Sequence, residues 1–261
     1  MAVELENEDR IISDFLKSIG PWRKHIVIGG GYAPIVYKLY LAGKEMGSPP
    51  VGTHDLDSLI PRKVPDASKK DIAKHLTEAG FRQMFKDREA PATEAYVKEV
   101  AGVEVEIEFL TDDATRGDKE RNVPIAGVVA QPLPYLKLSL QRTVKFKTFS
   151  GEAGRVVSPG AWMFHKGLTF VRRKPGESKR YKDLYGLWYV GTQLGMLSKR
   201  AIDEVRTIGR DHARWFTTFR CNLTEWSREA SPSEWSKLEV QDPFGKLRRL
   251  NFESLLETLF S

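Results

Sequence analysis

A run of three glycines followed by a closely spaced aspartate pair constrains this chain more than any other feature. Gly29–Gly31 stand between an apolar run and a helical pattern, and Asp55 and Asp57 flank one leucine in a second apolar run. Glycines at a strand-to-helix turn let backbone N–H groups approach a phosphate closely. Two carboxylates at i and i+2 of a strand share one face, where a divalent cation relieves their repulsion. The pattern predicts a metal–triphosphate site.

A third carboxylate is expected on a hairpin. Ala101-Gly102 separates two strand patterns, and in the second one Val103, Val105, Ile107 and Phe109 alternate with three glutamates. Two-metal transfer chemistry needs a further acid near the first two. Glu104, Glu106 and Glu108 are the candidates. The ordinary alternative is an antiparallel strand with one solvated face, and it explains at least one of the three.

The order of patterns along the chain predicts two domains. Strand and helix patterns alternate in the first half, and helical periodicity dominates after about residue 158. Ser68 and Asp71 resemble a capping box at the start of one helix. We expect an α/β (α+β) fold: a mixed sheet with flanking helices over residues 1–157, followed by an all-α domain over 158–261. The expected helices cover 8–19, 32–44, 68–79, 161–173, 178–194, 198–227 and 252–260, and the expected strands cover 25–28, 51–60, 95–100, 103–110 and further material within 128–149.

Composition narrows the class of partner. The 261-residue chain has a net charge of +6 and a pI near 9.2, which favours anionic partners such as nucleotides or nucleic acid. A basic but inert surface is the plain alternative. The single cysteine, Cys221, favours a reducing compartment. No apolar run approaches a membrane span and the N-terminus does not resemble a signal peptide, so we expect a cytoplasmic protein with no membrane partner.

These residues resemble the nucleotidyltransferase fold of DNA polymerase β-like enzymes. The resemblance rests on Gly29-Gly30, on the Asp55-Leu56-Asp57 strand and on the strand end Glu108-Phe109-Leu110-Thr111. It implies that Asp55, Asp57 and Glu108, with Glu106 as the alternative, bind Mg²⁺ or Mn²⁺, and that the substrate is a nucleoside triphosphate. Glutamate stands where this family often has aspartate. Metal-dependent glycosyltransferases also carry a D-x-D pair, but they need neither the glycine turn nor a third acid on a hairpin.

The C-terminal half is similar to the AbiEii-like branch of that superfamily, which includes nucleotidyltransferase toxins. The matching residues are Pro159, His165-Lys166, Arg172-Arg173 and Lys179 to Tyr185, and the resemblance covers about residues 25–190. It implies a catalytic role for Lys166 and, as partners, RNA or a tRNA end and a cognate antitoxin protein. The alternative for the basic residues is a solvated helix face. The implied nucleotide-binding residues are Gly29, Gly30, Gly31, Lys166, Arg172, Lys182 and Asp183.

The sequence therefore predicts metal-dependent transfer of a nucleoside monophosphate to an acceptor hydroxyl, in a cleft between the two halves. The acceptor stays open among RNA, a protein and a small molecule such as an aminoglycoside. A D-x-D glycosyltransferase and a catalytically degenerate RNA-binding protein are the alternatives in function. Intact acids at Asp55, Asp57 and Glu108 argue against degeneracy.

Overall fold

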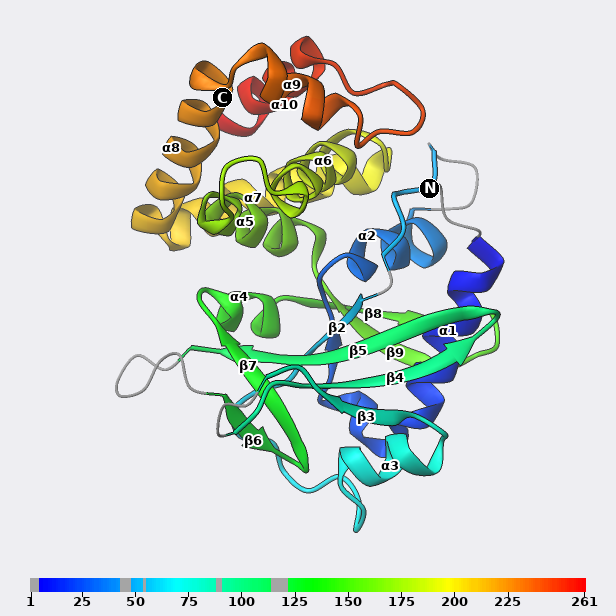
Figure 1. Ribbon diagram of the computed structural model, residues 1–261. Coiled ribbons are helices and arrows are strands. Elements are labelled where there is room, and N and C mark those ends of the chain that lie inside the picture. The colour runs from blue at the N-terminus through cyan, green and yellow to red at the C-terminus, as the bar shows by residue number, and fades with distance from the viewer. Residues whose placement is uncertain (1–4, 43–47, 54, 88–90, 114–121) are drawn as a thin grey trace. The chain divides into compact units, whose positions relative to one another are not determined.

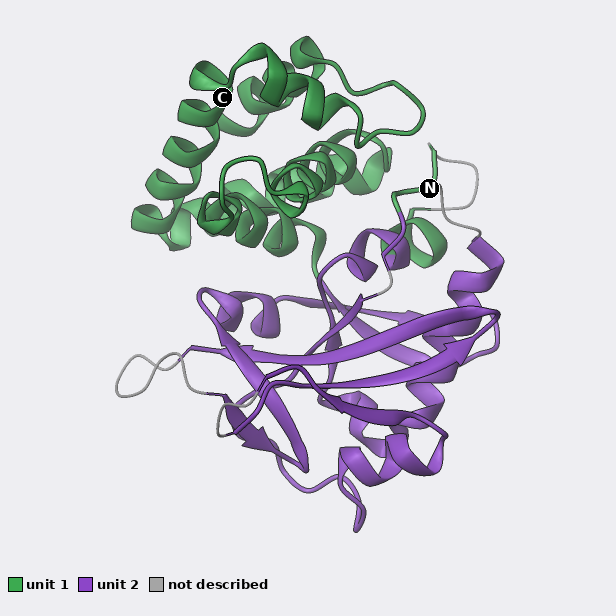
Figure 2. Ribbon diagram, viewed as in Figure 1, with its two compact units in different colours: residues 1–3, 37–51, 158–261 green, residues 4–36, 52–157 purple. Residues whose placement is uncertain are grey.

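The computed structural model divides the chain into two compact units (Figure 2). It describes residues 5–42, 48–53, 55–87, 91–113 and 122–261. The sheet unit comprises Glu4–Val36 and Gly52–Val157, and the helical unit comprises Met1–Val3, Tyr37–Val51 and Ser158–Ser261. The expected fold class is confirmed: a mixed α/β region with a central mixed sheet, and a C-terminal helical region. Residues 37–51, which we expected with the sheet, group with the C-terminal helices. The domain boundaries stay a prediction.

One mixed sheet organises the sheet unit (Figure 1). Its path among the described residues is β3-β4-β5-β2-β1-β9-β8, with β7 added beside β5 and β6 beside β7. The strands are β1 (Val27–Ile28), β2 (Asp55–Leu59), β3 (Arg82–Phe85), β4 (Glu94–Val100), β5 (Val103–Asp112), β6 (Val123–Ile125), β7 (Val128–Leu133), β8 (Thr143–Lys147) and β9 (Ala153–Val157). The long strand β5 is thus an inner strand, parallel to β2 and antiparallel to β4.

The two faces of this sheet differ in polarity. Val105, Ile107 and Phe109 of β5 are buried, as their alternation predicts, and Tyr96 of β4 packs edge-on against Phe109. Helix α1 (Leu5–Ser18) covers this apolar face, because Lys98 of β4 points the same way as Tyr96 and its Nζ bonds Asp14 of α1 at 2.8 Å. The glutamates of β5 therefore lie on the face turned away from α1.

The helix after the glycines is shorter and less regular than expected. The pattern predicts one helix over 32–44, whereas α2 (Tyr32–Val36) is followed by a π-helical turn over Tyr37–Leu41. Residues 43–47 lie outside the described part of the chain. All five residues of α2 are buried. Burial, rather than local helix propensity, therefore stabilises this segment. This is why hydrophobic periodicity alone wrongly predicted one regular helix here.

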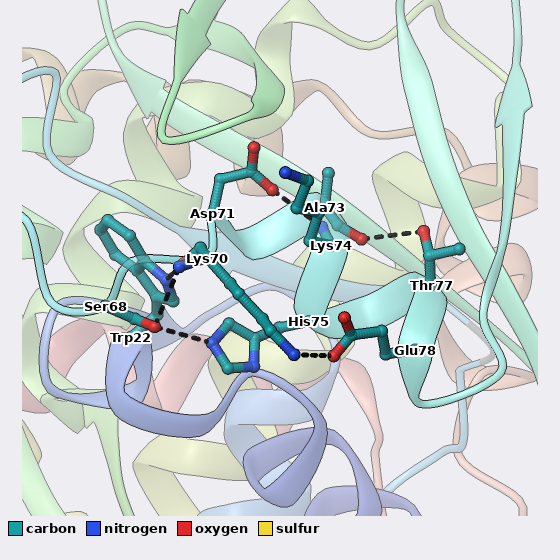
Figure 3. A network of polar contacts seen from close by, with 9 residues as sticks. All are labelled: Trp22, Ser68, Lys70, Asp71, Ala73, Lys74, His75, Thr77 and Glu78. Atoms are coloured by element: carbon teal, nitrogen blue, oxygen red, sulfur yellow. Dashed lines mark hydrogen bonds and ion pairs between the residues drawn. The ribbon is translucent and has the colours of Figure 1, made fainter.

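Helix α3 (Ile72–Glu78) corrects the expected capping box (Figure 3). Asp71 is the N-cap, and its Oδ1 accepts from the backbone N–H of Lys74 at 2.8 Å. Ser68 lies before the helix, where its Oγ accepts from the backbone N–H of Lys70 and contacts Nε2 of His75 at 3.2 Å. Aspartate and serine are equally good N-caps. The helix therefore begins after Asp71, three residues later than the start that we predicted at Ser68. The indole N–H of Trp22 bonds the Lys70 carbonyl at 2.9 Å and ties this turn to the rest of the unit.

Residues 128–149, in which we expected strand-like material, also contain a helix. Helix α4 (Leu136–Gln141) stands between β7 and β8. Tyr135 precedes it with a left-handed backbone, φ +64°. Leu136 and Leu138 are buried by it. Six residues are too short for a helical period to be told from strand alternation, which is why the sequence pattern missed α4.

The helical unit is confirmed as all-α, with two corrections. The helix expected over 198–227 is two helices, α7 and α8, which meet at His212 with φ −133°. Helix α9 was not expected; a capping box between Ser231 and Glu234 begins it. The helices are α5 (Pro159–Thr169), α6 (Ser178–Thr192), α7 (Met196–Asp211), α8 (Ala213–Glu229), α9 (Pro232–Glu239) and α10 (Arg249–Phe260). Within the described ranges, none of the helices combines the length and the apolar character that crossing a membrane requires.

Candidate functional site

Two acidic pairs lie side by side on neighbouring strands. β2 runs parallel to β5 with Asp55 opposite Glu106 and Asp57 opposite Glu108. Residues paired in this register share a face, and adjacent strands are about 4.8 Å apart. Asp55, Asp57, Glu106 and Glu108 are all partly exposed, while Leu56 and Ile107 between them are buried on the other face. The sheet thus gathers carboxylates from two distant segments into one acidic patch.

The glycine turn packs directly against this patch. The backbone N–H of Gly29 bonds the carbonyl of Asp57 at 2.9 Å. Gly30 has φ +50°, and a Cβ there would lie 1.6 Å from Oδ2 of Asp57. A Cβ at Gly31 would lie 2.7 Å from Cγ2 of Thr53. Only glycine fits at Gly30, both for its backbone and for its closeness to the carboxylate. The expected glycine turn and aspartate strand are therefore neighbours in space.

Lys86 is the member of the patch that sequence analysis missed. It directly follows β3, and its Nζ forms ion pairs with both Glu106 and Glu108. Burial lowers the pKa of this lysine, but the hydrogen bonds that it donates to Glu106 and Glu108, together with their negative charges, outweigh that effect and raise the pKa to about 12. A single lysine in a polar loop carries no sequence signal. The register of β3 against β4, with Met84 opposite Ala95, is what places it here.

The acidic patch fits a divalent cation by ligand type and by register. Carboxylate oxygens are the ligands that Mg²⁺ and Mn²⁺ prefer. A Cβ at Gly30 would collide with Oδ2 of Asp57, so the glycine brings its backbone directly against this carboxylate. Among the described residues, however, no group of three or more His, Cys, Asp or Glu side chains is already gathered as a metal site. Glu106 and Glu108 instead turn their oxygens toward Lys86.

A buried carboxyl lies behind the glycine turn. Glu8 of α1 is 8% exposed and forms a side-chain hydrogen bond with Tyr32, the first residue of α2. Burial raises the pKa of Glu8 to about 7, although the hydrogen bond to Tyr32 acts in the opposite direction. Burial first, and then the charges of Glu8 and Asp55, raise the pKa of Tyr32. Tyr32 therefore lies within electrostatic range of both Glu8 and the acidic patch.

The basic residues expected in the site belong to the helical unit. Nζ of Lys166, on α5, bonds Oδ1 of Asp183, on α6, at 2.5 Å and lies 5.6 Å from the ring centroid of Trp162. Nε of Arg173 reaches the second oxygen of Asp183 at 3.3 Å. The side chain of Asp183 is only 9% exposed. Lys166 and Asp183 are thus brought together, with the carboxylate shared between two cations.

The remaining expected residues have simple surroundings. Arg172 and Lys182 are exposed, Arg172 at the end of the 3₁₀ turn Phe170–Arg172 and Lys182 in the first turns of α6. Glu104 is exposed and pairs across the hairpin with Glu99. His54, which we expected to point away from the aspartates, lies outside the described residues.

Comparison with protein families gives one match over most of the chain. A family model described as nucleotidyltransferase matches residues 9–192, which spans the glycine turn, the acidic patch and helices α5 and α6. No curated protein matches the chain.

Two solved structures resemble the chain at low identity. An antigenic nucleotidyltransferase-like protein from Paracoccidioides brasiliensis is 13% identical, with 84% of this chain and 95% of that one covered and a TM-score of 0.43. JHP933 from Helicobacter pylori is 11% identical, with 99% and 93% covered and a TM-score of 0.41.

Proposed function

This chain belongs to the nucleotidyltransferase family, and from that premise we propose that it transfers a nucleoside monophosphate from a nucleoside triphosphate to an acceptor hydroxyl with the help of a divalent metal. The observation that carries the proposal is the register of β2 on β5, which sets Asp55 beside Glu106 and Asp57 beside Glu108 on one face. Four carboxylates on a small area call for a cation, and the glycine turn packs directly against one of them, that of Asp57.

Asp55, Asp57 and Glu108 are the residues that would hold Mg²⁺ or Mn²⁺, with Glu106 as the alternative third acid. When bound, the metal supplies positive charge that offsets the triphosphate and lowers the pKa of the acceptor hydroxyl. Asp57 is fixed for this task by two contacts with the glycine turn, through its backbone carbonyl and through its carboxylate. A rigid carboxylate is worth more to a site than a mobile one, because its position is set before the substrate arrives.

The glycine turn is proposed to receive the β- and γ-phosphates. Gly29, Gly30 and Gly31 have no side chains, so phosphate oxygens can approach the backbone of this turn. The N–H of Gly29 already bonds the Asp57 carbonyl, which leaves the N–H groups of Gly30 and Gly31 as the proposed donors. Lys166 is proposed to neutralise charge on the leaving pyrophosphate, while Arg172 and Lys182 add exposed positive charge. Asp183 holds Lys166 in place from its buried position.

The proposed reaction is a single displacement at the α-phosphorus. The acceptor oxygen forms a bond to the α-phosphorus, and the bond from that phosphorus to the α–β bridging oxygen breaks. Pyrophosphate leaves with the electron pair. The hydroxyl proton goes to Glu108 if this carboxylate is not the metal ligand, and to solvent if it is. The side chain of Glu108 is 17% exposed, so solvent has limited access to it.

RNA, in particular a tRNA end, is the proposed acceptor. Support comes from the net charge of +6 and from the exposed basic residues at Arg172, Lys174, Lys179 and Lys182. A polyanion gains from such a surface, whereas a neutral small molecule does not. The similarity of residues 159–185 to AbiEii-like toxins supports a role as the toxin of a toxin–antitoxin or phage-defence system, in the cytoplasm and with a cognate antitoxin protein.

A labelling assay tests the function. The purified protein is incubated with Mg²⁺, total RNA and each of the four nucleoside triphosphates in turn, radiolabelled at the α-phosphate. We expect one or more triphosphates to label RNA, and the Asp57→Asn variant to lose that label. Parallel reactions with a protein extract and with an aminoglycoside distinguish the other acceptors. Absence of label in every acceptor, or equal labelling by Asp57→Asn, contradicts the proposed transfer.

A further inference from the structure

We propose that Lys86 is the resident counterion of Glu106 and Glu108 in the metal-free protein, and that divalent metal binds by displacing it. The inference deepens the proposed function and rests on it, because it assumes that the acidic patch is the metal site. It concerns a lysine that the family pattern did not point to. Lys86 is a positioning residue here: it holds two carboxylates in place until the metal takes them.

The position of Lys86 follows from the sheet. β4 lies between β3 and β5, so a side chain at the end of β3 must cross β4 to reach β5. Met84 pairs with Ala95, and Ala95 pairs with Glu108 in turn. Lys86 is two residues beyond Met84 and therefore on the same face. The small side chain of Ala95 leaves a path along which the lysine reaches Glu108.

The charges explain why a cation is needed at this point. Glu106 and Glu108 are two residues apart on one strand, and each has an aspartate opposite on β2. Carboxylates this close repel one another unless a cation lies between them. Nζ of Lys86 meets one oxygen of each glutamate, although its side chain stays 38% exposed. One partly exposed ammonium thus neutralises part of the patch without closing it to solvent.

The same contacts make lysine and metal competitors. The oxygens that Lys86 occupies are those that Glu108, or Glu106, would offer to Mg²⁺ or Mn²⁺. Removing the lysine should therefore have two opposite effects: the metal-free protein loses a favourable contact, and the metal gains an empty site. A purely structural role for Lys86 predicts something different, since it would lower stability equally with and without metal and leave metal affinity unchanged or weaker.

The test measures metal binding and melting rather than transfer. Mn²⁺ affinity is determined by calorimetry and by electron paramagnetic resonance of free Mn²⁺, and melting temperature is recorded with and without Mn²⁺. The variants are Lys86→Met, which removes the charge, and Lys86→Arg, which keeps it. Lys98→Met is the matched control, because Lys98 is also a partly exposed, ion-paired lysine of this sheet, but its partner Asp14 lies on the opposite face.

We expect Lys86→Met to melt lower than wild type without metal, to bind Mn²⁺ about 5- to 10-fold more tightly, and to gain more in melting temperature when Mn²⁺ is added. Lys86→Arg should bind Mn²⁺ within about twofold of wild type, and Lys98→Met should leave the affinity unchanged. Unchanged or weaker Mn²⁺ binding by Lys86→Met overturns the inference.

An Asp57→Asn variant separates the two proposals. If Asp57→Asn abolishes Mn²⁺ binding while Lys86→Met leaves it unchanged, the metal assignment stands and only the role of Lys86 fails. If Asp57→Asn binds Mn²⁺ as wild type does, the acidic patch is not the metal site, and both the inference and the metal-dependent part of the proposed function are overturned.

Discussion

A Cβ atom on Gly30 would lie 1.6 Å from Oδ2 of Asp57, so the glycine turn and the aspartate strand interlock at this point. Gly30 and Asp57 are 27 residues apart in sequence, and the neighbouring Gly29 adds a backbone hydrogen bond to the Asp57 carbonyl at 2.9 Å. The requirement for glycine at this place therefore comes from the carboxylate as well as from the left-handed backbone.

Gly30→Ala should disable transfer by displacing Asp57. The positive φ costs about 1–2 kcal/mol for a residue with a Cβ, and the clash must move the carboxylate besides. A catalytic group misplaced by about 1 Å costs on the order of 100-fold in rate. Gly102→Ala is the matched control, because Gly102 also has positive φ, but nothing lies within 4 Å of its Cβ position. Kinetics and melting curves should show loss of stability in both variants and loss of activity only in Gly30→Ala.

The three glutamates of β5 should differ in their effect on activity. Glu108→Gln is expected to reduce kcat/KM by about 100-fold or more, because Glu108 lies opposite Asp57 and is proposed either to bind the metal or to take the acceptor proton. Glu104→Gln should be nearly silent, since Glu104 is exposed at the hairpin end. Single-turnover rates of the three variants check this order. Loss in Glu106→Gln with normal rates in Glu108→Gln would move the third acid to the Asp55 pair.

Substitutions of Lys166 and Lys182 should differ in their effect on stability, and both should affect nucleotide binding. Lys166→Met leaves the buried Asp183 with Arg173 alone, which should cost about 2 kcal/mol of stability. Lys182→Met changes an exposed residue and should leave the melting temperature within error. If both lysines contact the triphosphate, kcat/KM falls about 30- to 1000-fold at Lys166 and measurably at Lys182. Changes under about threefold in both variants would leave the helical unit without a part in the chemistry.

Glu8 should make stability fall as pH rises. Its pKa is raised from 4.5 to about 7 by burial, so the folded protein binds more protons than the unfolded chain between these values. The contribution of Glu8 to the free energy of unfolding is therefore greatest below about pH 4.5. As the pH rises to about 7, the folded protein loses on the order of 3 kcal/mol of this contribution. The glutamine of Glu8→Gln cannot ionise. The stability of this variant relative to wild type should therefore increase as the pH rises from about 4.5 to about 7. Denaturation curves of both proteins at about pH 5 and about pH 8 measure their free energies of unfolding. The same difference between variant and wild type at both pH values would contradict the prediction.

Sequence patterns predicted the parts of the site that depend on local rules. Alternation along β5 gave the face of Glu106 and Glu108, and the i, i+2 spacing gave the shared face of Asp55 and Asp57. Which strand would lie beside β2, and in what register, depends on packing of the whole sheet. The pairing of Asp57 with Glu108 is therefore visible only in the structure.

Features that depend on distant contacts were missed for the same reason. Lys86 joins the patch because β3 pairs with β4 in one register and Ala95 is small. The pairing of Lys166 with Asp183 depends on how α5 packs on α6. Helix α4 and the break at His212 are short-range events, but six residues and one residue respectively are too few to alter a hydrophobic period.

Replacement of the aspartates tests metal-dependent transfer at the acidic patch most directly. Transfer of the labelled α-phosphate by Asp55→Asn and Asp57→Asn is measured beside wild type, with melting curves of the metal-free proteins to confirm folding. Both variants should lose transfer while melting at or above the wild-type temperature, since each loses a charge from a patch of like charges. Retention of more than about a tenth of wild-type transfer by either folded variant, a change below about 1.4 kcal/mol in the barrier, would contradict the assignment of the patch as the metal site.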